Sequence, residues 1–208
     1  MSSYPIPRTL HRAEESIRRS RFIATIAHAP KSEDAKAFVA QIRDEFSDAT
    51  HNCWAYVAGP PGSTAQVGMS DDGEPHGTAG RPLLNVLLHS DIGEIAVVVT
   101  RYFGGIKLGT GGLVRAYSGV AQKALSALKV REKIIPAYLS VIVNYSNVST
   151  LRHMAMSFDA KIIRETYEAD VSYLFELPEE KADAFQESLT DLTRGEAIIE
   201  KHPDPDYS

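Results

Sequence analysis

The chain has 208 residues, of which 43% are hydrophobic, a composition ordinary for a globular protein of one or two domains. No apolar run is long enough to cross a bilayer, and the N-terminal stretch lacks the apolar core of a signal peptide, so neither a membrane protein nor a secreted one is expected. The single cysteine, Cys53, excludes an intrachain disulfide and indicates a reducing, cytoplasmic location.

The formal net charge is −5, and it is distributed unevenly along the chain. Residues 1–136 carry 16 basic and 13 acidic side chains, whereas residues 137–208 carry 6 basic and 14 acidic ones. This change coincides with a break near Ile135 and Pro136. We therefore expect two domains, residues 1–136 and 137–208, and the acidic second domain is a candidate surface for a protein partner.

In the first domain, hydrophobic periodicity and turn residues predict both helices and strands. Residues 1–7 are expected to form a loose tail. Residues 70–84 are expected to be a polar turn that leads into a helix, with Thr78 as a candidate cap. In chain order the elements are a strand at 9–17, a strand at 22–28, a helix at 32–46, a strand at 51–58, a helix that contains the apolar run 83–88, a strand at 97–100 and a helix beginning near residue 109.

In the second domain the same signals predict the order βαββαβ, which is the split βαβ, ferredoxin-like pattern. The last eight residues, 201–208, are expected to be a disordered tail. The elements are a strand at 138–145, a helix at 149–158, strands at 160–167 and 171–177, a helix at 179–192 and a strand at 197–200. The predicted fold class is α+β, with a first domain built as an α/β sandwich.

The stretch Val97–Val120 contains the most distinctive pattern of the chain. Four β-branched residues, Val97–Thr100, predict a buried strand. Two glycine clusters follow, Gly104-Gly105 and Gly109-Thr110-Gly111-Gly112, and the second opens a helix with an apolar stripe. A glycine-rich turn before a helix N-terminus exposes backbone N–H groups at the positive end of the helix dipole, a geometry that can hold an anion.

The charges around these glycines strengthen that interpretation. Residues 97–131 contain six basic side chains and no Asp or Glu, against the acidic balance of the whole chain. Phosphate or nucleic-acid contacts are therefore predicted for Arg21, Arg101, Tyr102, Lys107 and Arg115 together with the glycine clusters. The alternative remains open that the glycines only make turns and that the cations only solvate a helix face.

A second polar segment, SDDGEP at residues 70–75, has its own candidate roles. Its acidic side chains could bind a metal or supply a base, but their spacing matches no metal signature, and capping of nearby N–H groups is favoured. Cys53 and His51 lack a third orienting group, so Cys53 is interpreted as a core residue rather than a nucleophile. No cofactor, metal ion or catalytic residue is predicted. The candidate residues of this segment are His51, Ser70, Asp71, Asp72, Glu74, His76 and Thr78.

Five short motifs together resemble the Impact family, in particular its bacterial YigZ-type members. They are Ser20–Ile23, His51–Ala55, Ser70–Pro75, Gly77–Gly80 and Arg101–Gly109, in that order. The resemblance implies a first domain like domain two of a small-subunit ribosomal protein and domain four of elongation factor G. It also implies a ferredoxin-like second domain similar to the last domain of that factor. Eukaryotic members regulate translation by interfering with activation of a starvation-responsive kinase.

These observations lead to one principal hypothesis and two alternatives. The principal hypothesis is a cytoplasmic, non-catalytic protein that binds RNA or the ribosome and regulates translation. The first alternative is an enzyme that binds phosphate or a nucleotide with the glycine-rich helix start and the SDDGEP loop. The second alternative is a module that only binds other proteins.

Overall fold

The computed structural model describes residues 3–202, which form two compact units. The N-terminal unit comprises residues 4–133, and the C-terminal unit comprises residues 134–202 together with Ser3. The elements of the N-terminal unit are β1 (Ser3–Pro7), β2 (His11–Ile17), β3 (Ser20–His28), α1 (Ser32–Glu45), β4 (His51–Val57), β5 (Val67–Ser70), α2 (Gly80–Leu88), β6 (Ile95–Tyr102), α3 (Thr110–Ser126) and β7 (Val130–Ile134).

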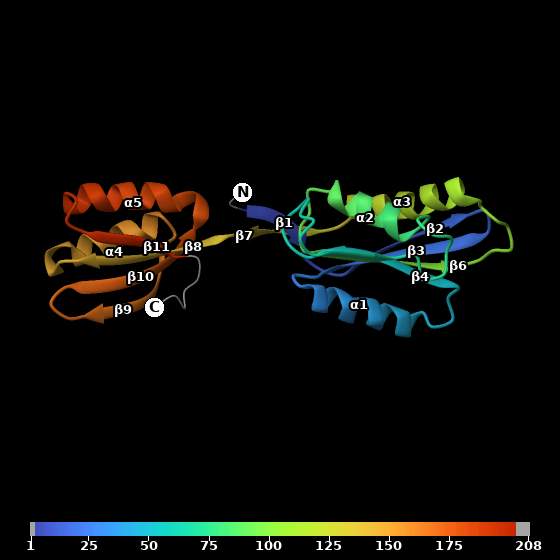
Figure 1. Cartoon of the computed structure of the whole chain (residues 1–208). Coiled ribbons are helices and arrows are strands. Elements are labelled where there is room, and N and C mark those ends of the chain that lie inside the picture. Colours follow the sequence, from blue (N-terminus) through green and yellow to red (C-terminus); the bar gives the residue numbers. More distant parts are fainter. Residues whose placement is uncertain (1–2, 203–208) are drawn as a thin grey trace. The chain divides into compact units, whose positions relative to one another are not determined.

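A five-stranded antiparallel sheet forms the centre of the N-terminal unit, with the strand order β2-β3-β6-β4-β5. Helix α1 packs on one face of this sheet, and helices α2 and α3 pack on the other (Figure 1). Because both faces are covered, the middle strand β6 is buried from Ile95 to Arg101. Its β-branched residues suit such a position, since they pack well on a pleated surface.

Alternation along β4 shows how one strand serves both cores. Cys53, Ala55 and Val57 belong to the core under α2 and α3, whereas Trp54 and Tyr56 pack on the side of α1. This division follows from the period-2 alternation of side chains along a strand. The predicted α3 stripe is also buried as expected, through residues that include Leu113, Tyr117, Val120, Ala121 and Ala124.

Three strands of the N-terminal unit were not expected from the sequence. The predicted tail at residues 1–7 is wrong for Ser3–Pro7, which form β1 and pair with β7. Tyr4 and Ile6 are buried there, and this burial offsets the cost of ordering the segment. The third unexpected strand, β5, pairs with β4 at the edge of the sheet. Residues 1–2 lie outside the described part of the chain.

The C-terminal unit has the expected element order βαββαβ. Its antiparallel sheet has the strand order β11-β8-β10-β9, and both helices contribute to one core with the inward residues of β8 and β10. Its elements are β8 (Pro136–Val143), a 3₁₀ turn η1 (Tyr145–Asn147), α4 (Val148–Ser157), β9 (Lys161–Tyr167), β10 (Val171–Pro178), α5 (Glu179–Thr193) and β11 (Ile198–His202).

The predicted C-terminal tail needs one correction. Lys201 and His202 belong to β11, where they pair with Leu139 and Tyr138 of β8. Residues 203–208 lie outside the described part of the chain. Taken together, the chain is an α+β protein with two sheet-based units. Within residues 3–202, no helix combines the length and the apolar character needed to cross a bilayer.

Candidate functional site

The start of helix α3 leaves backbone donors free. Gly109 precedes the helix with φ 72°, a left-handed conformation that favours glycine, and no side chain caps the helix. The first intrahelical bond runs from the Leu113 N–H to the Gly109 carbonyl at 2.9 Å. The N–H groups of residues 110–112 precede that donor, so they are available to a ligand. They lie at the positive end of the helix dipole.

The glycine loop lies against a hairpin turn from the beginning of the chain. A Cβ on Gly104 would lie 2.0 Å from the carbonyl carbon and oxygen of Arg19, so only glycine permits this approach. The Gly104 N–H donates to Ser20 Oγ at 3.2 Å. Arg18 and Arg19 form the two-residue turn between β2 and β3, with φ 46° and 68°, as hairpins of this length require.

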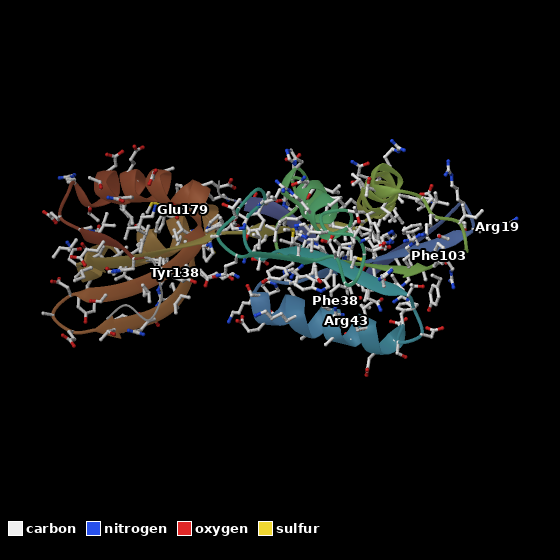
Figure 2. The ribbon with its side chains drawn as sticks, turned by 45° about the vertical axis from the view of Figure 1, so that its right-hand side comes forward. Arg19, Phe38, Arg43, Phe103, Tyr138 and Glu179 are labelled. Carbon is white, nitrogen blue, oxygen red and sulfur yellow. The ribbon has the colours of Figure 1, made fainter. Side chains whose placement is uncertain are left out.

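Four exposed cations surround the start of α3, and we call them the basic rim: Arg18, Arg19, Lys107 and Arg115. None of the four forms an ion pair with a carboxylate among residues 3–202. Arg18 and Arg115 line one depression of about 230 Å³ together with Leu108 and Gly112. Arg19 and the exposed ring of Phe103 lie at the same end of the unit (Figure 2).

The sequence predicted only two members of the basic rim, Lys107 and Arg115. Arg18 and Arg19 belong to it because β3 pairs with β6 so that Arg21 lies opposite Tyr102. That register brings the β2–β3 turn beside the loop that follows β6. A double arginine in a two-residue hairpin turn was the available signal, since both side chains must then lie on the surface.

Arg21 differs from the basic rim because its charge is already matched. Its guanidinium donates two hydrogen bonds to the Glu14 carboxylate, at 2.7 and 2.8 Å. These bonds lower the pKa of Glu14 below its ordinary value. Arg21 also lies over the ring of Tyr102, whose hydroxyl donates to Asp48 at 2.7 Å. Both residues are thus engaged in a surface network with carboxylates.

Arg101 is not the exposed cation that its acid-free segment suggested. It is only 4% exposed, and its Nη1 lies 2.5 Å from Oε1 of Glu74. Its Nη2 donates to Ser20 Oγ at 3.3 Å. The guanidinium carbon lies within 5.3–5.4 Å of the ring centres of Phe22 and Phe103. The carboxylate that neutralises Arg101 comes from the SDDGEP loop, which is distant in sequence but adjacent in space.

Glu74 is the centre of a buried polar cluster. Its Oε1 accepts a hydrogen bond from the Tyr117 hydroxyl at 2.9 Å, in addition to the contact with Arg101. The Nε2 atom of His51 lies 3.9 Å from the same oxygen. Burial, reinforced by Cys53 and Glu74, raises the pKa of Tyr117. The phenol therefore acts as a neutral donor to the carboxylate.

Cys53 belongs to the core beneath this cluster. Its thiol donates to the Asp71 carbonyl at 2.9 Å and contacts the Tyr117 hydroxyl at 3.3 Å. Burial raises the pKa of the thiol to about 12. Since the thiolate is the reactive form, Cys53 is a poor nucleophile at neutral pH, as expected from its position on β4.

Asp71 of the SDDGEP loop caps helix α2. Its carboxylate accepts from the N–H groups of Gly77, Ala79 and Gly80, at 2.8, 3.0 and 2.8 Å. Burial acts to raise the pKa of Asp71, but the three backbone donors outweigh it, and the pKa is lowered. Thr78 is not the cap, because its hydroxyl donates to the Pro75 carbonyl at 2.6 Å.

Asp72 ties the loop to the sheet and to α1. Its Oδ2 accepts from the Asn52 N–H at 2.7 Å, and its Oδ1 pairs with Arg43. Its carbonyl contacts Nδ1 of His51 at 2.8 Å, and its N–H donates to Ser70 Oγ at 3.1 Å. The remaining candidate, His76, is exposed, and its Nδ1 lies 3.6 Å from Oδ2 of Asp71. Within residues 3–202, no group of three or more His, Cys, Asp or Glu side chains is arranged to hold a metal ion.

One cavity unites the two predicted segments, and we call it the Glu74 cavity. Its volume is about 420 Å³. On one side it is lined by His51 and by Glu74 of the SDDGEP loop. On the other side it is lined by Arg101, Lys107 and the start of α3. Its lining residues are Thr50, His51, Glu74, Pro75, Arg101, Phe103, Lys107, Leu108, Gly109, Thr110 and Leu113. The other predicted site residues do not line it: Arg21, Ser70, Asp71, Asp72, His76, Thr78, Tyr102, Gly104, Gly105, Gly111, Gly112 and Arg115.

Comparison with known proteins places this α+β chain in a family. Residues 18–125 match the Impact N-terminal domain, and residues 141–196 match a domain of unknown function, DUF1949. The IMPACT family member YigZ of Escherichia coli is 44% identical over 195 residues, which cover 94% of this chain and 96% of YigZ. An IMPACT family member of Haemophilus influenzae is 39% identical over 200 residues, covering 96% and 97% of the two chains. The chain therefore belongs to the Impact family.

Two further comparisons, with a solved structure and with a eukaryotic protein, show how much of the chain is shared. A crystal structure described as that of a hypothetical protein has a TM-score of 0.69 and 43% identity, and the match covers 96% of this chain and 97% of that one. The mouse protein named IMPACT is 33% identical over 107 residues, which cover 50% of this chain and 33% of the mouse protein. Similarity to the eukaryotic protein thus extends over about half of this chain.

Proposed function

We propose that this chain is an RNA-binding protein that acts on the ribosome or its RNA and so regulates translation. The observation that carries the proposal is the basic rim: four exposed cations without an ion-pair partner in the described chain surround the free amides of α3. Unpaired cations gain most from phosphate contacts, because no intramolecular pair must be broken first. The free amides add fixed donors for one phosphate.

The surroundings of the basic rim support a nucleic acid rather than a simple anion. Phe103 presents a ring that is 46% exposed beside Lys107, and aromatic rings next to cations suit unstacked bases. Arg21 and Arg101 take no direct part in the phosphate contacts, since Glu14 and Glu74 already neutralise them. The resemblance to the Impact family implies units like domains of a ribosomal protein and of elongation factor G, and such domains would suit this function.

The direct test measures the affinity for single-stranded RNA and for ribosomal subunits as salt is raised. Alanine replacement of all four rim residues should lower the affinity and reduce the slope of log K against log salt by about 0.7 per lost contact with a single strand. A matched control removes four exposed cations elsewhere in the N-terminal unit: Lys36, Arg81, Lys129 and Arg131. Equal losses in both variants would mean that only net charge matters and would contradict the proposal.

An enzyme acting on a phosphorylated small molecule is the second candidate function. The observation that favours it is that His51 and Glu74, both able to move protons, line the same cavity as the start of α3. A nucleotide with magnesium should then raise the melting temperature and be converted to product. Absence of both effects across the common nucleotides would reject this candidate.

The acidic C-terminal unit is proposed to bind a protein partner. One face of α5 gathers Asp183, Glu187 and Asp191 around a shallow depression. Capture of a ribosomal or other basic protein should persist after nuclease treatment, and it should be lost when these three residues are replaced by Asn or Gln. Capture that disappears with nuclease alone would assign the interaction to RNA.

A further inference from the structure

Arg101, which lines the Glu74 cavity, has a buried donor without a partner among residues 3–202. This donor is the Nε–H, which makes no hydrogen bond within the described part of the chain, and the residue as a whole is only 4% exposed. Leaving such a group unpaired is destabilising, and more so for a charged side chain. A ligand whose acceptor reaches Nε through a small shift of the Arg101 side chain would recover that energy.

Glu74 offers the complementary group beside it. The Oε1 atom of Glu74 is contacted by Arg101, Tyr117 and His51, whereas Oε2 takes part in none of these three contacts. Because Arg101 and Glu74 neutralise one another, the depth of the cavity has no strong preference for an ion. It suits an uncharged polar edge that accepts from Arg101 and donates to Glu74, which is the pattern on the edges of nucleobases.

The rest of the lining is apolar. Pro75, Leu108 and Leu113 contribute aliphatic surface, and Phe103 contributes an aromatic ring that solvent reaches. Such a ring offers a surface on which an unstacked base can stack. A volume of about 420 Å³ lies in the range of sites that enclose one small ligand, and it is too small for a folded nucleic acid.

The basic side of the same cavity supplies the position for a phosphate. Lys107, Gly109 and Thr110 line it, and the free amides of α3 begin there. We infer that the Glu74 cavity binds one nucleotide unit, with the base edge at Arg101 and Glu74, the ring on Phe103, and the phosphate at Lys107 and the start of α3. This inference deepens the proposed RNA binding, because a free mononucleotide and an unstacked nucleotide of RNA present the same chemistry.

Calorimetry with the full chain tests the inference. Nucleoside 5′-monophosphates should bind, whereas ribose 5-phosphate, which lacks the base, should bind at least about tenfold more weakly. Phe103→Ala should weaken the mononucleotide about tenfold, and Leu10→Ala, which also removes an exposed apolar side chain from this unit, should not. Binding of ribose 5-phosphate as tight as that of the mononucleotides, or no binding of any mononucleotide, would overturn the inference.

Arg101→Lys tests the base edge separately. Lysine keeps a positive charge beside Glu74 but removes the Nε–H donor, so mononucleotide affinity should fall while ribose 5-phosphate affinity is unchanged. An unchanged melting temperature verifies the fold. If this variant does not fold, Phe103→Ala and the comparison of the two ligands still decide the inference.

The effect of Phe103→Ala on two ligands, together with a competition between them, distinguishes the source of the nucleotide. If RNA supplies it, Phe103→Ala should weaken a single-stranded oligonucleotide as much as a mononucleotide, and the two should compete. If a free nucleotide is the ligand, Phe103→Ala should weaken the mononucleotide and leave the affinity for the oligonucleotide unchanged. Replacement of Arg18 and Arg19, which do not line the Glu74 cavity, should lower RNA affinity alone. Failure of the basic rim and failure of the cavity therefore give different results.

Discussion

The guanidinium of Arg101 and the carboxylate of Glu74 lie 2.5 Å apart beneath the surface of the N-terminal unit, and both residues are more than 90% buried. They come from β6 and from the SDDGEP loop, which are 27 residues apart in the chain. Their pairing holds the acidic loop against the glycine loop and creates the floor of the Glu74 cavity. A surface pair of the same chemistry, Arg21 with Glu14, allows the effect of burial to be measured.

Glu74→Ala should destabilise the protein strongly. It leaves the Arg101 guanidinium buried without its counter-charge, and breaking a buried pair typically costs about 3–5 kcal/mol of unfolding free energy. Urea denaturation checks this value. Glu14→Ala is the control, because it breaks an exposed arginine pair that water and salt already screen. Similar losses of unfolding free energy in Glu74→Ala and Glu14→Ala would mean that the buried pair is no more important for stability than the exposed one.

Asp71→Ala should shorten or loosen the start of α2, because three N–H groups lose their acceptor. The expected loss at neutral pH is about 1 kcal/mol, as for other helix caps. The pKa of Asp71 is lowered from 3.8 in the folded protein. Its stabilising effect is therefore complete above that value and is lost as pH falls through the lower folded pKa. The difference between wild type and variant should thus shrink in acid, whereas a constant difference would argue against capping by the ionised carboxylate.

Two glycines of the same unit should respond in opposite directions to alanine. Gly119 lies inside α3 with open space around an added Cβ, so Gly119→Ala should stabilise the protein by about 0.5–1 kcal/mol. Gly104→Ala should destabilise it, because the new atom meets the Arg19 backbone at 2.0 Å. The displaced hairpin turn should also weaken RNA binding. Thermal unfolding and RNA titration of both variants provide the comparison.

Cys53 should be unreactive in the folded protein. Its pKa of about 12 leaves little thiolate at pH 8, and the side chain is fully buried. Alkylation followed by mass spectrometry should therefore be slow under native conditions and fast in denaturant. Rapid labelling of the native chain would mean that the cluster of Cys53, Tyr117 and Glu74 opens readily.

Most regular elements of this chain could be predicted from local pattern. The stripe from Leu113 to Ala124 indicated α3, and the alternation of His51–Ala58 indicated β4, because each element must bury one face. The short strands β1, β5 and β7 were not predicted, because strand pairing rather than local periodicity stabilises them: β1 pairs with the distant β7, and β5 pairs with β4 at the edge of the sheet. The prediction that the SDDGEP carboxylates cap nearby N–H groups is confirmed by Asp71. The sequence assigned the cap of α2 to Thr78 instead, because the path by which the loop folds back onto the helix follows no spacing rule.

Residue order alone establishes an α+β chain with a glycine-rich, acid-free segment before its third helix, because periodicity and composition are local properties. Which cations of that segment remain free is settled only by folding. Arg101 is neutralised by a carboxylate from another loop, while the turn residues Arg18 and Arg19 are carried to the helix start by strand register. Charge pairing depends on distance in space, and neighbours in space need not be neighbours along the polypeptide.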